Sequence, residues 1–296
     1  MPRVLVTGAG GLVGQHLCRR LLEAGWTVRG FGRSPRPPTL EGVEWLQGDV
    51  TDAASAARAA ASCEATVHLA CLPLGASNQD PWQALRINTG GTLNLLQAAL
   101  EGGVERVVFA SSGQVYGGHG PLPNREADVP RPDSHYAASK LAGEAWCEAF
   151  RARGLSVCML RLFNVYGPSL DGRPRNTVEV LFLQAARRGQ RPIIDGNRDT
   201  GRDFIHVRDV VEAIYLALSH RDAQGPIIVG TGVCTSLAEL AILAARVCHT
   251  QVEPEVGGPL GPPIRFQADT QRAQDELGFR ATIDLASGLP GLAEAA

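Results

Sequence analysis

Arg3-Val-Leu-Val-Thr7-Gly8-Ala-Gly-Gly11-Leu-Val-Gly14 opens the chain with a short apolar run that leads into closely spaced glycines. Leu17, Leu21 and Leu22 continue at helical spacing up to a stop at Gly25. The stretch therefore predicts a strand, a tight turn and a helix. Glycines in such a turn let the backbone approach a pyrophosphate, whose charge is held by free N–H groups and the positive end of the helix. This context favours a dinucleotide site over a plain strand-to-helix turn.

Further apolar segments alternate with helical patterns along the chain. We expect strands at 27–31, 43–46, 65–70, 104–110 and 155–162, and a long helix at about 81–100. The alternation predicts an α/β fold, a Rossmann-type doubly wound parallel sheet. Ligands of such folds lie at the carboxyl ends of the strands, and four candidate residues fall there: Gly8, Asp49, Ala70 and Ser112.

The pattern changes after residue 170, where elements shorten and glycine and proline become denser. We expect a dinucleotide-binding domain over 1–170 and a smaller C-terminal α/β substrate domain over 171–296, with the stretch near 203–233 returning to the first. Seven arginines lie between 173 and 202, in a nearly neutral protein. Such a cluster indicates an anionic ligand such as a diphosphate, and Arg202, before an apolar run, is the better candidate to bind it.

Composition excludes several function classes. The chain has 296 residues, is 44% hydrophobic and carries a formal net charge of −2, so it lacks the basic surface that nucleic-acid binding requires. No apolar run approaches about 18 residues and no signal-peptide pattern is seen, so we expect a cytoplasmic protein without a membrane span. The seven cysteines form no C-x-x-C pair, which indicates neither a disulfide framework nor a metal site.

The end of the second expected strand reads Gly32-Arg33-Ser34. A carboxylate usually binds the ribose 2′-hydroxyl of NAD at this place, about 20 residues after the glycines. Its absence removes repulsion toward a 2′-phosphate, and Arg33 could attract one. Arg33 could equally stack on the adenine or point to solvent. The sequence therefore leaves NAD and NADP both open.

Lys140 is the only lysine among the 28 lysines and arginines of the chain, and Tyr136 precedes it by four residues. On a helix this spacing places the phenol and the ammonium on one face, one turn apart. A cation beside a phenol favours phenolate and lowers the tyrosine pKa from about 10. His68, in a nearly continuous apolar strand with no partner at metal spacing, is expected to pack or to position backbone near the cofactor.

These motifs together resemble the extended short-chain dehydrogenase/reductase family, in its NAD-dependent epimerase/dehydratase branch. The resemblance covers nearly the whole chain. It rests on the order and spacing of these stretches: Thr7-Gly8-x-x-Gly11-x-x-Gly14, Gly48-Asp49-Val-Thr-Asp52, Val67-His-Leu-Ala70, Asn88 with Gly91-Thr92, Ser111-Ser112, Tyr136-x-x-x-Lys140, Arg161-x-x-Asn164-Val-Tyr-Gly-Pro168, Gly201-Arg202-Asp203 and Val229-Gly-Thr-Gly232.

The resemblance implies roles for matching positions. Tyr136 is the expected general acid/base, Lys140 binds the nicotinamide ribose, and Ser112 bonds the reacting substrate oxygen. Asn164 and Arg202 match positions that hold the diphosphate of a nucleotide-diphospho sugar. Cofactor contacts are expected from Gly8, Gly11, Leu12, Val13, Gly14, Arg33, Asp49, Val50, Leu69, Ala70, Asn88, Tyr136 and Lys140. The family's four-helix arrangement implies a homodimer through helices near 85–100 and 136–152.

Departures from the family pattern narrow the reaction. The 4,6-dehydratases carry an Asp-Glu pair after the catalytic hydroxyl, where this chain has Gly113 and Gln114, so elimination is disfavoured. The expected activity is an NAD(P)-dependent epimerisation of a nucleotide-diphospho sugar, at C4 through a transient 4-keto intermediate. The alternatives are an NADPH-dependent reductase of a 4-keto sugar nucleotide and a dinucleotide-sensing protein without chemistry. Arg265 is a weaker candidate to replace a missing C-terminal substrate contact.

Overall fold

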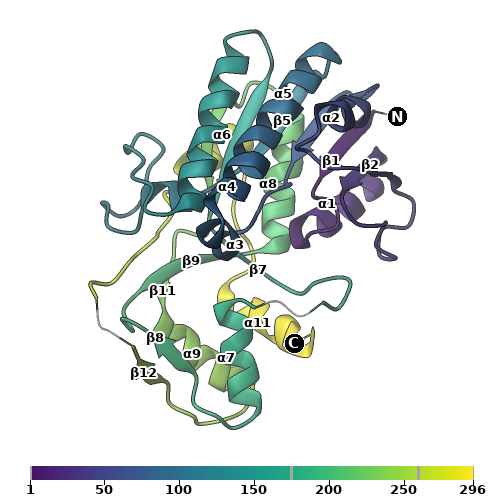
Figure 1. The fold of residues 1–296 in the computed structure, drawn as a ribbon. Coiled ribbons are helices and arrows are strands. Elements are labelled where there is room, and N and C mark those ends of the chain that lie inside the picture. Colours follow the sequence, from purple (N-terminus) through teal and green to yellow (C-terminus); the bar gives the residue numbers. More distant parts are fainter. Residues whose placement is uncertain (1, 174–175, 259–260, 296) are drawn as a thin grey trace.

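A seven-stranded sheet forms the larger part of the molecule (Figure 1), described by a computed structural model over residues 2–173, 176–258 and 261–295. All its strand pairs are parallel, in the order β10-β6-β5-β4-β1-β2-β3. The order runs outward from β1 in both directions, so a crevice opens beyond the carboxyl ends of β1 and β4. The expected Rossmann-type doubly wound sheet is confirmed, with strands β1 (Arg3–Thr7), β2 (Thr27–Gly32), β3 (Glu44–Gln47), β4 (Ala65–His68), β5 (Arg106–Ser112), β6 (Val157–Leu162) and β10 (Gly225–Val229).

Helices cover both faces of this sheet, each over its own apolar cluster. On one face lie α1 (Leu12–Glu23), α8 (Val207–Ser219) and α10 (Gln271–Leu277), whose side chains share a core with β1, β6 and β10. The second face carries α2 (Ala53–Ala60), α5 (Gly91–Glu101) and α6 (His135–Arg151). Except for the edge strand β3, the strands are buried on both faces, which explains why they are nearly continuous in apolar residues.

The helix expected at about 81–100 is divided in the structure. After α3 (Leu74–Gln79), the chain forms α4 (Pro81–Ala84), a π-helical turn η1 (Leu85–Gly90) and then α5. Asp80 caps α4 by accepting from the Gln83 N–H at 2.9 Å. At the start of α5, a Cβ on Gly91 would come within 2.6 Å of Val50, so the close approach of this helix to the sheet edge requires glycine. A short 3₁₀ turn, η2 (Gly113–Tyr116), follows β5.

A smaller α/β part lies below the large sheet in Figure 1. It contains a three-stranded sheet in the order β11-β9-β7 and a two-stranded sheet of β8 and β12. The helices enclose a separate apolar cluster around Tyr166 and Leu240. The elements are β7 (Asn164–Tyr166), α7 (Val178–Arg187), β8 (Ile193–Asp195), β9 (Gly201–His206), β11 (Cys234–Ser236), α9 (Leu237–Val247), β12 (Glu255–Gly257) and α11 (Leu285–Ala295). The boundary at residue 170 stays a prediction.

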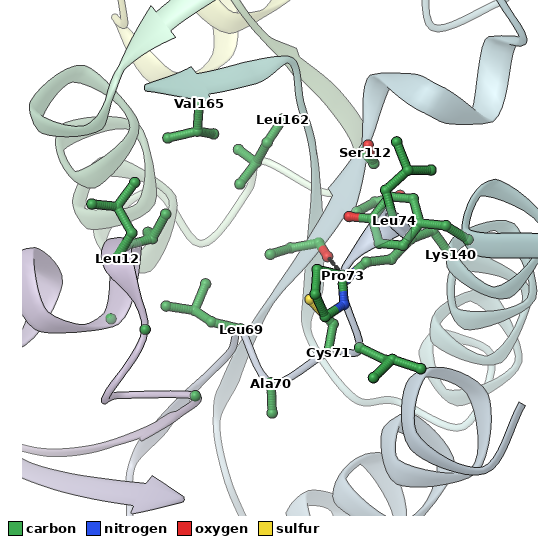
Figure 2. A pocket seen from close by; sticks show the side chains of 18 of the residues that line it. Leu12, Leu69, Ala70, Cys71, Pro73, Leu74, Ser112, Lys140, Leu162 and Val165 are labelled. Atoms are coloured by element: carbon green, nitrogen blue, oxygen red, sulfur yellow. Dashed lines mark hydrogen bonds between the residues drawn. The ribbon is translucent and has the colours of Figure 1, made fainter. Parts of the chain in front are cut away.

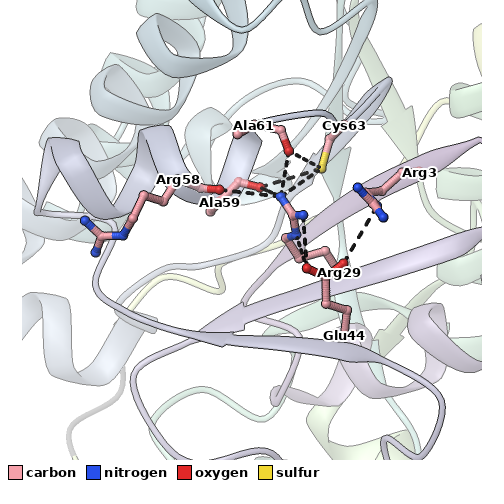
Figure 3. A network of polar contacts seen from close by, with 7 residues as sticks. All are labelled: Arg3, Arg29, Glu44, Arg58, Ala59, Ala61 and Cys63. Carbon is pink, nitrogen blue, oxygen red and sulfur yellow. Dashed lines mark hydrogen bonds and ion pairs between the residues drawn. The ribbon is translucent and has the colours of Figure 1, made fainter.

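Buried arginines tie the layers of the large sheet together. Arg29 on β2 donates to the carbonyl oxygens of Ala59 at 2.9 Å and Ala61 at 2.7 Å, at the carboxyl end of α2 (Figure 3). Its Nε also donates to Glu44 on β3 at 3.0 Å. A cation at the end of a helix satisfies carbonyls that have no partner within the helix. Arg29 thus joins β2, β3 and α2 at the edge of the sheet.

No helix within residues 2–173, 176–258 and 261–295 is long and apolar enough to cross a membrane. All seven cysteines are free thiols in the structure, and four of them, Cys18, Cys63, Cys147 and Cys158, are buried with pKa values raised by burial. They behave as small apolar core residues.

Candidate active site

A cavity of about 690 Å³ lies across the carboxyl ends of the central strands (Figure 2). Its walls come from the glycine turn, the ends of β2, β4 and β5, helix α6 and the start of β7. Most of the residues predicted from sequence line it: Gly8, Gly11, Leu12, Val13, Gly14, Arg33, Asp49, Val50, Leu69, Ala70, Ser112, Tyr136, Lys140 and Asn164. The fold therefore gathers residues from distant segments into one cavity.

The glycine turn leaves no space for side chains. Gly8 has a φ of +67°, and a Cβ there would lie 2.8 Å from the Ala70 nitrogen. A Cβ on Gly14 would lie 2.3 Å from the Gly8 oxygen. The Gly11 N–H donates to that oxygen at 2.9 Å, which closes the turn. The bare backbone at the start of α1 fits a dinucleotide pyrophosphate.

His68 supports this turn from behind. Its Nδ1 lies 2.7 Å from the Thr7 Oγ1 and its Nε2 lies 3.0 Å from the Thr92 Oγ1. The Thr7 hydroxyl in turn accepts the Ala70 N–H at 3.2 Å. Burial, helped by repulsion from Lys140, lowers the pKa of His68 to about 3, so the ring is neutral. The positioning role expected for His68 agrees with this geometry.

The end of the cavity beside β2, where adenosine would bind, is the place where the usual carboxylate is missing. A Cβ on Gly32 would lie 3.2 Å from the Trp45 ring, which packs against the end of β2. The Trp45 Nε1 donates to the Ser34 carbonyl at 3.2 Å and holds the indole there. Arg33 lines the cavity and its side chain is exposed. A side chain at position 32 would therefore require the Trp45 ring to shift by a few tenths of an ångström, and the charged side chains of Arg33 and Asp49 line the cavity nearby.

Tyr136 and Lys140 project from the first turns of α6, beside Ser112 at the end of β5. Ser134 begins the helix by accepting the Ala137 N–H at 3.2 Å. The Lys140 ammonium is buried, donates to the Ala110 carbonyl at 2.7 Å and lies 5.8 Å from the Tyr136 ring centroid. Figure 2 shows Ser112 and Lys140 on the same side of the cavity. The predicted serine, tyrosine and lysine are therefore neighbours.

The pKa of Tyr136 differs from the sequence expectation. Burial and the nearby Cys71 thiol raise the pKa of the phenol, while a hydrogen bond with Ser112 acts to lower it. Lys140 was expected to lower this pKa, but its ammonium lies over the ring face and is engaged by Ala110. In this structure burial dominates, and the phenol is protonated at neutral pH.

A buried ion pair lies one turn beyond Lys140, and sequence reasoning did not find it. Glu144 accepts two hydrogen bonds from Arg161 on β6, at 2.9 and 2.7 Å, and one from the Ser111 hydroxyl. Arg161 also donates to the Tyr116 hydroxyl at 2.6 Å. The ion pair joins α6, β5 and β6 directly behind Ser112, Tyr136 and Lys140. The signal that the sequence offered is that Glu144 follows Lys140 by four residues.

Two predicted contacts lie outside the cavity wall. Asn88 is buried, accepts the Leu72 N–H at 2.6 Å and donates to the Ser139 Oγ at 2.9 Å. It therefore supports the wall at Leu72 and does not line the cavity itself. Arg202 lies on β9 next to Asp203, which does line the cavity.

The Arg202 guanidinium stacks over the Phe266 ring, 5.7 Å from its centroid. Burial lowers the pKa of Arg202, with the Asp133 carboxylate acting against it. Within the described residues no hydrogen bond or ion pair engages its nitrogens. By contrast, the adjacent Asp203 accepts N–H groups of Thr231, Gly232 and Ala268 and is fully used in holding those loops. Arg175, another member of the arginine cluster, lies outside the described residues.

The substrate end of the cavity also contains residues that the sequence did not single out. Gly113 lines it, and a Cβ there would lie 2.8 Å from the Phe163 ring, so no acid could occupy that position without displacing the ring. Of the remaining unpredicted lining residues, Ile87, Leu162 and Val165 lie in stretches that the sequence indicated without singling them out. The others carry no periodic or motif signal and include Cys71, Leu72, Pro73, Leu74, Thr177 and Phe266. Among the described residues no group of His, Cys, Asp and Glu side chains could hold a metal ion.

A Rossmann-type sheet with a glycine turn, and with serine, tyrosine and lysine meeting in one cavity, defines a short-chain dehydrogenase/reductase class of protein. The chain belongs to the NAD dependent epimerase/dehydratase family, whose family model matches residues 4–230.

Relatives resemble the chain over nearly its full length. It is 35% identical to UDP-glucose 4-epimerase of Mycolicibacterium smegmatis, over 97% of this chain and 96% of that protein. The solved structure of MoeE5 in complex with UDP-glucuronic acid and NAD is 36% identical, with a TM-score of 0.90, covering 99% of this chain and 98% of that one. UDP-glucose 4-epimerase of Thermotoga maritima with UDP-glucose is 28% identical, with a TM-score of 0.91 and the same coverages.

Proposed function

We propose that the protein is an NAD-dependent epimerase of a UDP-sugar, acting at C4. The observation that carries this proposal is the meeting of Ser112, Tyr136 and Lys140 in one cavity of about 690 Å³. The similarity to UDP-glucose 4-epimerases over nearly the whole chain supports the substrate class.

The cavity fits a dinucleotide. The backbone of the glycine turn would hold the pyrophosphate, and the Lys140 ammonium would bind the hydroxyls of the nicotinamide ribose. Bound NAD would take the hydride from C4 of the sugar and return it to the opposite face. We favour NAD because solved structures similar to this chain contain it. Arg33 leaves NADP as the alternative.

Tyr136 is the general base of the proposed reaction. Its phenolate oxygen would accept the proton of the C4 hydroxyl as the 4-keto sugar forms, and the resulting phenol would give that proton back when hydride returns to C4. Burial keeps the phenol protonated in the structure, so the base form depends on positive charge near the ring. Lys140 supplies one such charge, 5.8 Å from the ring centroid. Ser112 would orient the same substrate oxygen.

The diphosphate of the substrate would be held by Asn164, at the start of β7, and by Arg202. Arg202 has an unengaged fork of donors beside the cavity, and such a fork matches phosphate geometry. On the sugar side, Gly113 and the Phe163 ring exclude an acid at the position that dehydratases use. This supports epimerisation over elimination of water.

The purified protein tests the proposal when it is incubated with UDP-glucose or UDP-galactose and catalytic NAD. We expect each sugar to be converted to the other, as measured by anion-exchange chromatography. Tyr136→Phe should reduce turnover by about 10²- to 10⁴-fold while NAD still binds. Absence of epimers from both sugars, and from UDP-glucuronic acid, would overturn the proposal.

A reductase is the second candidate, and the exposed Arg33 at the adenosine end favours it. A reductase of a 4-keto UDP-sugar would consume one NADPH for each turnover, whereas an epimerase consumes none. Loss of absorbance at 340 nm with a 4-keto substrate separates the two. Stoichiometric oxidation of NADPH by the wild type, weakened in Arg33→Ala, would favour the reductase.

We further propose that the protein forms a homodimer through α4 and α6. Trp82 is 70% exposed, Leu85 50% and Trp146 37%, and they lie on helices that contact one another. Large apolar side chains gathered on adjacent helices are typical of a protein–protein interface. Light scattering should give a dimer mass, and Trp82→Glu should shift it toward the monomer. A monomeric wild type would contradict this interface.

A further inference from the structure

Two successive side chains of α1 hold the segment that follows β7, residues 168–173. The Gln15 Nε2 donates to the Asp171 carboxylate at 2.9 Å, and the His16 Nε2 lies 2.9 Å from the Pro168 carbonyl oxygen. These contacts join positions about half the chain apart. In Figure 1 the loop after β7 extends beneath α1. The segment is therefore docked on the helix that follows the glycine turn.

The side chain of Gln15 forms hydrogen bonds with three separate segments of the chain. Besides Asp171, its side-chain amide donates to the Gly10 carbonyl at 3.0 Å and accepts from the Thr39 hydroxyl at 2.6 Å. Gly10 belongs to the glycine turn, and Thr39 belongs to the loop after β2. The residue is 1% exposed, although its two side-chain ends are fully polar. A buried glutamine with every contact satisfied holds its partners in one arrangement.

The carboxylate of Asp171 is also held in position for its contact with Gln15. It accepts the Ser169 hydroxyl at 2.6 Å and the Arg173 N–H at 3.1 Å, so its orientation is set within its own loop. Its side chain is 9% exposed, whereas that of Arg173, its ion-pair partner at 3.3 Å, is 72% exposed. The Gln15 contact is therefore the protected one, and the Arg173 contact is open to solvent.

The docked segment does not line the cavity itself but joins two parts of the chain that do. It continues directly from Asn164 and Val165, which line the substrate end, and ends on α1, whose first turn lines the cofactor end. Figure 2 places Leu12 and Val165 on the same side of the cavity. The Gln15–Asp171 contact therefore ties these two parts of the cavity wall together, and breaking it would free them to move apart.

We propose that the Gln15–Asp171 contact is a latch that slows release of the bound dinucleotide, so that one NAD serves many turnovers. The inference rests on the proposed function, because an epimerase regenerates its NAD at each cycle and benefits from keeping it. The latch acts on cofactor residence and takes no part in proton or hydride transfer.

The test compares cofactor release in Asp171→Ala with the wild type and with Arg173→Ala. Each protein is loaded with fluorescent NADH, and release is followed after mixing with excess NAD. We expect about tenfold faster release from Asp171→Ala, since hydrogen bonds to charged groups contribute about 1.5–3 kcal/mol. Arg173→Ala removes the exposed partner of the same carboxylate and should release NADH at the wild-type rate. Turnover at saturating NAD should be unchanged in both.

Gln15→Leu and the double variant with Asp171→Ala complete the design. A latch predicts that the double variant releases NADH no faster than the faster of the two single variants, because each removes the same contact. Thermal unfolding of each protein separates faster release from loss of fold. Equal release rates in wild type and Asp171→Ala would overturn the latch alone. A protein that binds neither NAD nor NADP would overturn the proposed function together with it.

Discussion

Arg106 is a buried arginine and Arg202 a half-buried one, and their surroundings differ. Arg106 on β5 is 1% exposed, and its guanidinium donates six hydrogen bonds, five of them to carbonyl oxygens at or beyond the end of α8. Arg202 on β9 has an aromatic ring beneath it. In the part of the chain that the structure describes, no oxygen accepts from it.

The different surroundings of the two arginines indicate that Arg106 contributes to stability and Arg202 to binding. Burying a charge is costly unless hydrogen bonds compensate for lost water. The buried charge of Arg106 is compensated by hydrogen bonds within the protein, so replacing Arg106 should lower the free energy of unfolding. Arg202 keeps its donors available beside the cavity, so its replacement should be felt as loss of substrate affinity.

The largest expected effect follows from Arg106→Met. This change strands the carbonyl oxygens of Ala217 and Ala223 in a buried place, so unfolding free energy should fall by about 3–5 kcal/mol. Urea unfolding followed by circular dichroism measures it. The fraction that remains folded should keep wild-type turnover. A variant as stable as the wild type would show that the hydrogen bonds of Arg106 contribute little.

Glu144 and Arg161 test the same principle closer to the catalytic residues. Glu144→Gln leaves the buried Arg161 charge without its carboxylate, and breaking such a pair costs about 3 kcal/mol or more. The double variant Glu144→Leu with Arg161→Met removes both charges and should recover part of that loss. Additive losses in the double variant would contradict a coupled pair. Turnover should fall in both, because Ser111, which precedes Ser112 on β5, loses the carboxylate that accepts from its hydroxyl.

The variant Arg202→Met tests the binding role of Arg202 in this comparison. Losing charged hydrogen bonds to the substrate diphosphate should raise KM for UDP-glucose by about 10- to 100-fold. Unfolding free energy should stay within about 0.5 kcal/mol of the wild type, since no contact within the described protein is lost beyond the Phe266 stacking. Titration calorimetry with UDP separates affinity from turnover. A large loss of stability with unchanged UDP affinity would assign Arg202 to the fold.

The smallest effect concerns His68, a buried group that is satisfied in its neutral form. Its folded pKa of about 3 lies below the unfolded value near 6.5, so the unfolded chain binds the extra proton first. Its contribution to stability is therefore present above pH 6.5 and is lost as pH falls toward 3, by at most about 1.4 kcal/mol per pH unit. His68→Asn should flatten the change in unfolding free energy between pH 6.5 and 5. Parallel curves for both proteins would rule out His68 as the group responsible.

The cofactor half was easier to predict than the substrate half because its signals are local. A strand, three glycines and a helix follow one another within residues 3–23, and the backbone geometry there depends on residues that are close in sequence. The Tyr136 and Lys140 spacing has the same character. At the substrate end, Thr177 and Phe266 reach the cavity from separate elements without any motif. Asn88 is a motif position whose side chain supports the wall from behind, at Leu72.

The sequence by itself determined the sheet class, the glycine turn and the placement of Tyr136 and Lys140 on one helix face, because periodicity and turn chemistry act over a few residues. The resemblance to a family implied that Ser112 lies beside them. Only the tertiary structure decided which charges are compensated. The Gln15–Asp171 contact joins residues 156 positions apart, and the bonds of Arg106 to Ala217 join residues 111 apart. Burial also decided the pKa of Tyr136, which spacing to Lys140 had suggested would fall. Desolvation depends on the whole fold around a group, and no local pattern encodes it.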